Sequence, residues 1–124
     1  MINMPIQTAV KHKDSNQSSL SNWLVGSVWA LYDFDGVNAK PRKNTWNFYS
    51  DKRVRDPGSW DMGWSIISDE RVIIKDGETK YFELVFITHD FFIAFNTSTG
   101  RTPPYFMTDI IHAGYLESGM GQLL

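Results

Sequence analysis

Residues 60–96, with the sequence WDMGWSIISDERVIIKDGETKYFELVFITHDFFIAFN, decide the fold. Short segments rich in β-branched and aromatic residues alternate there with turn formers such as Asp76-Gly77 and His89-Asp90. In the clearest segments, apolar residues recur at every second position, which is typical of strands with one buried face. One such face carries Trp60, Met62, Trp64 and Ile66. The stretch therefore predicts consecutive β-strands joined by tight turns.

The same pattern continues on both sides of this stretch. Segments follow one another at intervals of about ten residues, which predicts an antiparallel meander. The expected strands are residues 28–34, 45–49 with an extension toward Val54, 60–67, 71–75, 80–88, 91–96 and 105–111. No convincing amphipathic segment of about 12 residues or more is present, so a parallel sheet would lack its crossover helices. We expect an all-β fold: an antiparallel meander closed into a small barrel or half-barrel, with a short N-terminal helical turn near residues 19–24. Two packed sheets are the alternative.

Composition limits the possible functions. The chain has 124 residues, of which 15% are aromatic, a net charge of −2 and no cysteine. This length suits one domain, and we expect a polar N-terminal arm over residues 1–22, a barrel over 23–117 and a tail over 118–124. The lack of a basic excess argues against nucleic-acid binding. The absence of cysteine excludes disulfides, thiol catalysis and cysteine-based zinc sites.

The sequence also lacks recognisable targeting signals. Its first residues have no cationic and apolar secretory pattern. The strongest apolar run, residues 91–95, is far shorter than the roughly 20 residues that cross a bilayer. We expect a cytoplasmic protein with no membrane span and no cofactor, present as a monomer or a homodimer.

Residues 24–29, LVGSVW, resemble the start of lipocalin-like (calycin) domains. In that family, a short helical turn leads into a strand whose Trp closes one end of the barrel. Residues 46–51 and 63–66 resemble the second and third strands of small bacterial lipocalin-like domains. The resemblance covers residues 23–96, and it implies a cup that binds a small apolar or amphipathic molecule.

One departure from the family pattern concerns Gly26 and Trp29. Two residues separate them, whereas the family has one. The family often places an Arg beside the end-closing Trp, and the resemblance makes Arg101 the candidate for that position. A bulge in the strand would accommodate the additional residue.

Aromatic side chains and a few polar ones make up the candidate binding site. Pockets for small molecules commonly combine aromatic walls with a few orienting polar groups. The residues predicted to line the cup are Trp29, Trp46, Phe48, Trp64, Phe82, Glu83, Phe86 and Arg101. Two alternatives stay open. The aromatic residues can fill the barrel as an ordinary core, and Glu83 can face water on the outer surface.

Other polar residues give weaker signals. Histidines and carboxylates can hold a divalent metal, and the only residues that hint at such a site are His89, Asp90, Asp109 and His112. Their spacing matches no motif, so we assign no metal site and no catalytic residue. A positive cluster is interpreted as a solvated rim and consists of Arg42, Lys43, Lys52, Arg53 and Arg55.

These observations favour a non-enzymatic protein that binds a small apolar or amphipathic ligand. The alternative is an immunity or inhibitor protein that neutralises a toxin, with acidic loops that meet a basic partner protein. The acidic residues considered for that contact are Asp33, Asp35, Asp61, Asp69 and Glu70. A calycin-type isomerase or lyase is the third interpretation, with Glu83 as its interior acid–base candidate.

Overall fold

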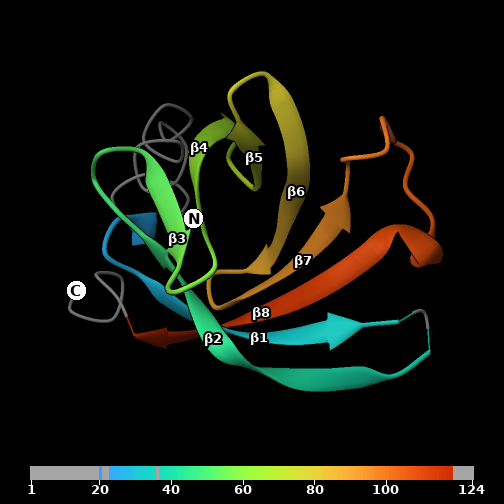
Figure 1. Ribbon diagram of the computed structural model, residues 1–124, viewed down its shortest axis with the longest axis horizontal. Helices are drawn as coiled ribbons and strands as arrows, with labels where there is room; N and C mark the ends of the chain where they lie inside the picture. Colours follow the sequence, from blue (N-terminus) through green and yellow to red (C-terminus); the bar gives the residue numbers. More distant parts are fainter. Residues whose placement is uncertain (1–19, 21–22, 36, 119–124) are drawn as a thin grey trace, which may run out of the picture.

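Eight antiparallel strands form a closed barrel in the computed structural model, which describes residues 20, 23–35 and 37–118 (Figure 1). The strands are β1 (Val28–Phe34), β2 (Ala39–Phe48), β3 (Arg53–Asp56), β4 (Trp60–Ser68), β5 (Arg71–Asp76), β6 (Thr79–Thr88), β7 (Phe91–Asn96) and β8 (Ile110–Ser118). A 3-10 helix, η1 (Met107–Asp109), precedes β8. The predicted all-β barrel is confirmed. Most of the predicted arm and tail lies outside the described residues.

The barrel closes because β1 has a partner strand on each side. Trp29 on β1 lies opposite Trp46 on β2 and opposite Leu116 on β8. Each strand in between pairs with its neighbours in sequence order. Closure protects the sheet, since free strand edges are templates for aggregation. It also decides the question that the sequence left open between a barrel, a half-barrel and two sheets.

The second strand is longer than predicted. β2 begins at Ala39, whereas the pattern indicated a start at residue 45. Residues 39–44 are mostly exposed and carry no apolar alternation. They form a strand because their backbone pairs with β1, which places Ala39 opposite Phe34. The predicted extension toward Val54 is a separate strand, β3.

The last strand lies further along the chain than predicted. The pattern indicated residues 105–111, whereas β8 spans Ile110–Ser118. Residues 97–109 form the connection between β7 and β8 and include the cis peptide bond Pro103-Pro104. In β8, Ala113 and Gly114 interrupt the strand-favouring residues Ile110, Ile111 and Tyr115, so the strand pattern is weak in the middle of the segment. It is a strand because β1 and β7 pair with it on both sides.

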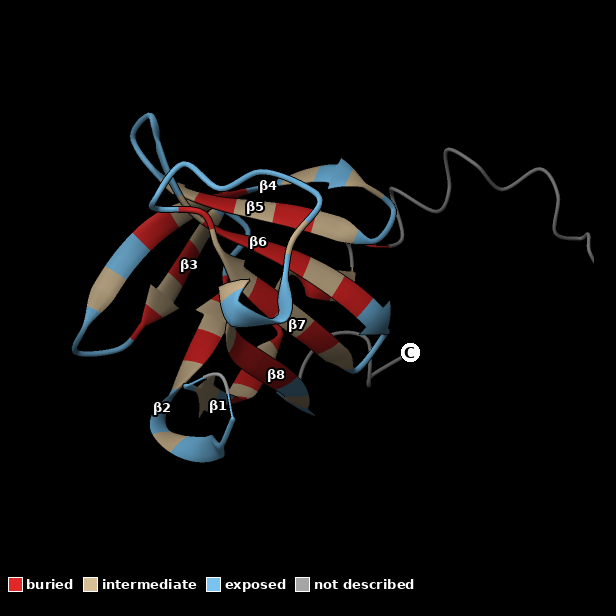
Figure 2. Cartoon of the chain, turned by 90° about the vertical axis from the view of Figure 1, so that its right-hand side faces the viewer, coloured by how far each residue is buried: buried red, intermediate tan, exposed pale blue. Residues whose placement is uncertain are grey.

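Burial alternates along the strands, as the period of two predicts. Figure 2 shows buried bands separated by less buried ones along β5 and β6. On β4, Met62 and Trp64 are buried, Trp60 and Ile66 are half-buried, and Asp61 between them is exposed. The predicted inner face of this strand is confirmed.

Aromatic rings form a continuous chain through the barrel interior. The Trp29 and Phe92 ring centroids are 4.9 Å apart, those of Phe92 and Trp46 are 6.0 Å apart, and those of Trp46 and Phe82 are 5.1 Å apart. Trp29, Trp46 and Phe92 are fully buried. Burial of each large apolar side chain contributes about 1.5–3 kcal/mol, so this chain of rings is a main source of stability. Between Trp29 and Trp46 the interior is occupied by the protein's own side chains.

A helical turn covers one end of the barrel, which we call the closed end. Leu20, Trp23 and Leu24 have helical backbone, and both leucines are buried. The Trp23 ring lies 5.6 Å from the ring of Trp29 and 5.6 Å from that of Phe86. None of the helices in the described part of the chain has the combined length and apolar character that a membrane crossing needs. The predicted helical turn therefore leads into β1 and seals this end.

Gly26 and Ser27 account for the spacing before Trp29. Gly26 has φ = +83°, a conformation that favours glycine, and it turns the chain from the helical turn into β1. Trp29 Nε1 donates a hydrogen bond of 2.8 Å to Ser27 Oγ, and the Ser27 hydroxyl donates to the Leu24 carbonyl. The residues between Gly26 and Trp29 thus include the serine that joins the turn to the indole.

Gly114 on β8 makes room for the ring of Phe92. The two residues are register partners, and a Cβ atom at Gly114 would overlap the Phe92 ring. Phe92 contacts both Trp29 and Trp46. The glycine is therefore required by the packing of the core.

We expect Gly114→Ala to lower the free energy of unfolding by about 1–3 kcal/mol, because the added methyl group overpacks the core. Urea unfolding followed by tryptophan fluorescence measures the loss. Gly63→Ala is the matched control, since a Cβ there would lie 3.4 Å from the Arg53 guanidinium, close to an ordinary contact. Equal losses in the two variants would contradict this explanation.

Candidate functional site

Four polar side chains meet at the end of the barrel opposite the helical turn, which we call the distal end. Arg42 of β2 donates to Asp33 Oδ1 at 3.2 Å and to Asp56 Oδ2 at 3.0 Å. His112 Nδ1 of β8 lies 2.9 Å from Asp33 Oδ1. Asp33 and His112 are register partners on β1 and β8. The closure of the barrel thus brings these four residues together.

Alternation along the strands points three of the four side chains, those of Asp33, Asp56 and His112, inward. Asp33 follows the buried Trp29 and Leu31 at intervals of two residues, and Asp56 follows the buried Val54 in the same way. His112 is the register partner of Ala94, a core residue of β7. These polar groups therefore continue the inner apolar face to the end of the barrel.

Burial within the cluster increases from the rim toward the interior. The Asp33 side chain is 47% exposed and that of Arg42 is 26% exposed. His112 is 9% exposed and Asp56 is completely buried. Asp33 and Arg42 therefore mark the solvent side of the site, and Asp56 marks its inner side.

Several buried polar atoms at the distal end have no hydrogen-bond partner among the residues that the structure describes. They are Arg42 Nε, Trp46 Nε1 and Asp56 Oδ1. Native proteins pair about 90% or more of their buried polar groups, because an unpaired one costs about 1–3 kcal/mol. The concentration of such atoms at this end of the barrel makes it the candidate site.

Aromatic rings form the floor beneath these polar groups. The Trp46 ring lies 5.2 Å from the Trp60 ring, 5.1 Å from the Phe82 ring and 5.2 Å from the His112 ring. Phe82 also contacts His112, at 5.5 Å. The distal end therefore presents donors and an acceptor directly against an apolar surface.

Burial lowers the pKa of His112 below its ordinary value of 6.5, and the negative charge of Asp33 opposes this shift only in part. At neutral pH the imidazole is uncharged. The charges of the cluster are then one guanidinium, on Arg42, and two carboxylates, on Asp33 and Asp56.

The predicted cup residues occupy different parts of the barrel. Trp46 and Phe82 belong to the floor of the distal end, whereas Trp29 and Phe86 lie at the closed end, in contact with Trp23. The remaining aromatic pair, Phe48 and Trp64, have their ring centroids 5.9 Å apart. All six are buried, so they contribute to the core that the sequence analysis offered as the alternative.

Glu83 and Arg101 lie outside this aromatic cluster and have separate partners. Glu83 accepts hydrogen bonds of 2.6 Å from Arg71 Nη1 and from the Tyr105 hydroxyl, and Arg101 Nε pairs with Asp109 at 3.1 Å. Only 5% of Glu83 is exposed. Glu83 is therefore buried and does not face water.

Tyr105 fixes the β7–β8 connection over the outer face of the barrel. Its ring stacks on Phe95 at a centroid distance of 4.5 Å and an interplanar angle of 10°. Burial, followed by the contact with the Glu83 carboxylate, raises the pKa of Tyr105. The connection is therefore held by a neutral tyrosine, a buried carboxylate and Arg71.

The histidines considered for a metal site lie at opposite ends of the barrel. His89 is close to the Trp23 ring at the closed end, with a centroid distance of 5.2 Å, whereas His112 lies at the distal end. Within the described part of the chain, no group of three or more His, Asp and Glu side chains is arranged to hold a metal ion. The four residues that prompted the metal hypothesis are not brought together.

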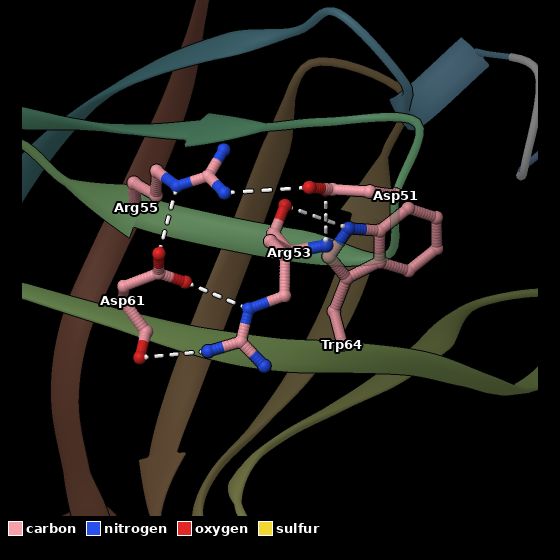
Figure 3. A network of polar contacts seen from close by, with 5 residues as sticks. All are labelled: Asp51, Arg53, Arg55, Asp61 and Trp64. Atoms are coloured by element: carbon pink, nitrogen blue, oxygen red, sulfur yellow. Dashed lines mark hydrogen bonds and ion pairs between the residues drawn. The ribbon is translucent and has the colours of Figure 1, made fainter.

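Much of the positive cluster belongs to a surface network that Figure 3 shows. Asp61 accepts hydrogen bonds of 2.8 Å from Arg53 Nε and from Arg55 Nε, and Arg55 also pairs with Asp51 at 3.3 Å. The hydrogen bond from Arg55 is the largest cause that lowers the pKa of Asp61. A groove of about 390 Å³ beside the network is lined by Asp51, Lys52, Arg53, Gly63, Trp64, Ser65, Lys75 and Gly77. These arginines are therefore partly neutralised by neighbouring carboxylates.

Sequence reasoning missed three of the four residues in the polar cluster. Asp33 is among the acidic residues considered for a partner protein, Arg42 belongs to the positive cluster interpreted as a rim, and Asp56 is not among the candidate site residues. A signal for Asp33 was present, because Trp29, Leu31 and Asp33 alternate on one face. For Arg42 no local signal existed, since its strand is polar throughout its first half.

The lowered pKa of His112 predicts a pH-dependent stability. Below about pH 6.5 the unfolded chain binds a proton at His112 while the folded protein does not, so the free energy of unfolding decreases as the pH falls from 7 to 5.5. His112→Gln should reduce this slope, whereas His89→Gln, at an exposed residue, should leave it unchanged. Chemical denaturation at each pH provides the measurement. An unchanged slope in His112→Gln would contradict the assignment.

Tyr105→Phe removes one hydrogen bond to a buried carboxylate and should lower the free energy of unfolding by about 1–2 kcal/mol. Thermal and urea unfolding check this value. Tyr115→Phe is the control, because Tyr115 is 47% exposed, and it should have little effect. A similar effect of both changes would show that the hydroxyl contact with Glu83 is not stabilising.

Comparison with known proteins finds no matching family model, no matching curated protein and no matching solved structure. The closed eight-stranded antiparallel barrel with its buried aromatic cluster fits a lipocalin-like fold.

Proposed function

We propose that the protein is a non-enzymatic binding protein that holds a small amphipathic molecule at the distal end of the barrel. The polar part of the ligand pairs with the unpartnered buried atoms of Arg42, Trp46 and Asp56. Its apolar part lies against the aromatic floor. The observation that carries the proposal is the coincidence of unpartnered buried polar atoms and packed aromatic rings at one end of the barrel.

The difference between the two ends of the barrel also supports binding at the distal end. At the closed end, Trp23 and Trp29 pack against each other beneath the helical turn. In the middle, Phe92 and Trp46 are in ring contact. A ligand therefore enters from the distal side and rests above Trp46. This arrangement agrees with the lipocalin-like resemblance, in which one end is closed by Trp and the other receives the ligand.

Apolar contact and polar pairing contribute differently to this binding. Burial of apolar surface supplies roughly 25 cal/mol per Å² before the costs of association. The polar atoms supply orientation and specificity, because a ligand that leaves them unpaired gains less binding free energy. The proposal thus predicts preference for molecules that have both parts.

The distribution of charge makes the inhibitor interpretation the weaker one. An inhibitor of a basic toxin needs acidic side chains that are free to contact that toxin. Asp33 pairs with Arg42, and Asp61 pairs with Arg53 and Arg55. Two of the five acidic residues considered are therefore engaged within the chain.

Calorimetric titration with a panel of single-ring amphiphiles tests the proposal. At least one member should bind saturably, and Trp46→Phe should weaken that binding by about fivefold or more, because it removes a donor and part of the floor. Trp23→Phe, at the closed end, is the matched control and should leave the affinity within about twofold. Absence of saturable binding across the panel, or equal affinity of Trp46→Phe and the unchanged protein, would refute the proposal.

A further inference from the structure

Resting on the proposed function, we infer that the ligand of the distal end is an organic cation: a primary ammonium or a protonated nitrogen heterocycle attached to an apolar body. The inference begins with the balance of charge. Arg42 is the one guanidinium of the cluster, and it faces two carboxylates, Asp33 and Asp56. His112 is a neutral neighbour at pH 7. The cluster therefore carries a net charge of −1.

The positive charge of Arg42 is already engaged. Nη1 contacts Asp33 at 3.2 Å and Nη2 contacts Asp56 at 3.0 Å. An incoming anion would have to compete with both carboxylates for the same guanidinium. Because these groups are partly or fully buried, their repulsion of an anion is screened less than it would be in water.

Asp56 supplies the position at which a cation binds. Its side chain is completely buried, Oδ2 accepts from Arg42, and Oδ1 has no partner among the described residues. An ammonium N–H is a donor with charge opposite to that of Asp56, and a charge-assisted hydrogen bond of this kind is stronger than a neutral one. A ligand carboxylate offers no donor to Oδ1 and brings a like charge to it.

The surrounding groups are compatible with this choice. The buried ring of Trp46 and the half-buried ring of Trp60 lie 5.2 Å apart beside the cluster, and the π face of an indole attracts a cation. Trp46 Nε1 and Arg42 Nε are free donors for a neutral oxygen on the same ligand. The nearest additional cation by register is Lys40, opposite Asp33. It is exposed and makes no ion pair with Asp33 among the described residues, so solvent screens its charge.

Three probes with the same phenylpropyl body separate charge from shape: 3-phenylpropan-1-amine, 3-phenylpropan-1-ol and 3-phenylpropanoate. Calorimetric titration of the full chain at pH 7.5 should give an affinity for the amine at least tenfold higher than that for the carboxylate, with the alcohol between them. Equal or tighter binding of the alcohol or the carboxylate would overturn the cation inference while amphiphile binding itself stands. Failure of all three to bind would overturn both.

Asp56→Asn tests whether the buried carboxylate is the source of the preference. It removes the charge and keeps the size of the side chain, and it should reduce the ratio of amine to carboxylate affinity about tenfold. Asp61→Asn is the matched control, because Asp61 lies on the outer surface with Arg53 and Arg55, and it should preserve the ratio. Should Asp56→Asn not fold, Arg42→Gln replaces it and should raise the affinity for the amine. If the ratio of amine to carboxylate affinity is unchanged in whichever of these two variants folds, the inference is overturned.

Discussion

The pairing of the first strand with the last is the interaction on which the rest of the structure depends. β1 and β8 are joined over most of their length, and their contact turns a meander into a barrel. The closure requires that the large ring of Phe92 lie against β8, which Gly114 permits. Without this contact the core would lose the wall that encloses Trp29 and Trp46. The pairing of β1 with β8 and the lack of a side chain at Gly114 therefore together determine whether the interior is shielded from water.

Closure also creates the polar cluster of the distal end. Asp33 and His112 are far apart in the sequence and become neighbours only across the β1–β8 seam. Arg42 and Asp56 join them from the next two strands. The two ends of the barrel are therefore chemically different: Trp23 seals one end, and charged groups line the other. The proposed ligand site lies at the charged end. Its proposed preference for a cation follows from two carboxylates that share one guanidinium.

Local patterns predicted the strands wherever the apolar alternation was strong. β1 and β7 have the predicted bounds, and β4 differs by one residue at its end. The pattern failed for the polar half of β2 and for β8, since both are strands through pairing with neighbours and not through their own composition. The aromatic residues proposed for the cup were found in the interior. Two polar ones, Glu83 and Arg101, bind other residues because the β7–β8 connection folds over the outer face and brings Tyr105 and Asp109 to them.

The amino-acid sequence by itself determined that this chain forms an antiparallel meander of short strands with an aromatic face and a helical turn before the first strand, whereas the closure of that meander into a barrel came from the pairing of β1 with β8. The period of two and the turn residues are local properties, and they suffice for the meander. Only the tertiary structure decided which polar side chains meet. The positions of Asp33, Arg42, Asp56 and His112 depend on the register between strands that are distant in the chain. A shift of one residue in that register would turn each of these side chains to the opposite face.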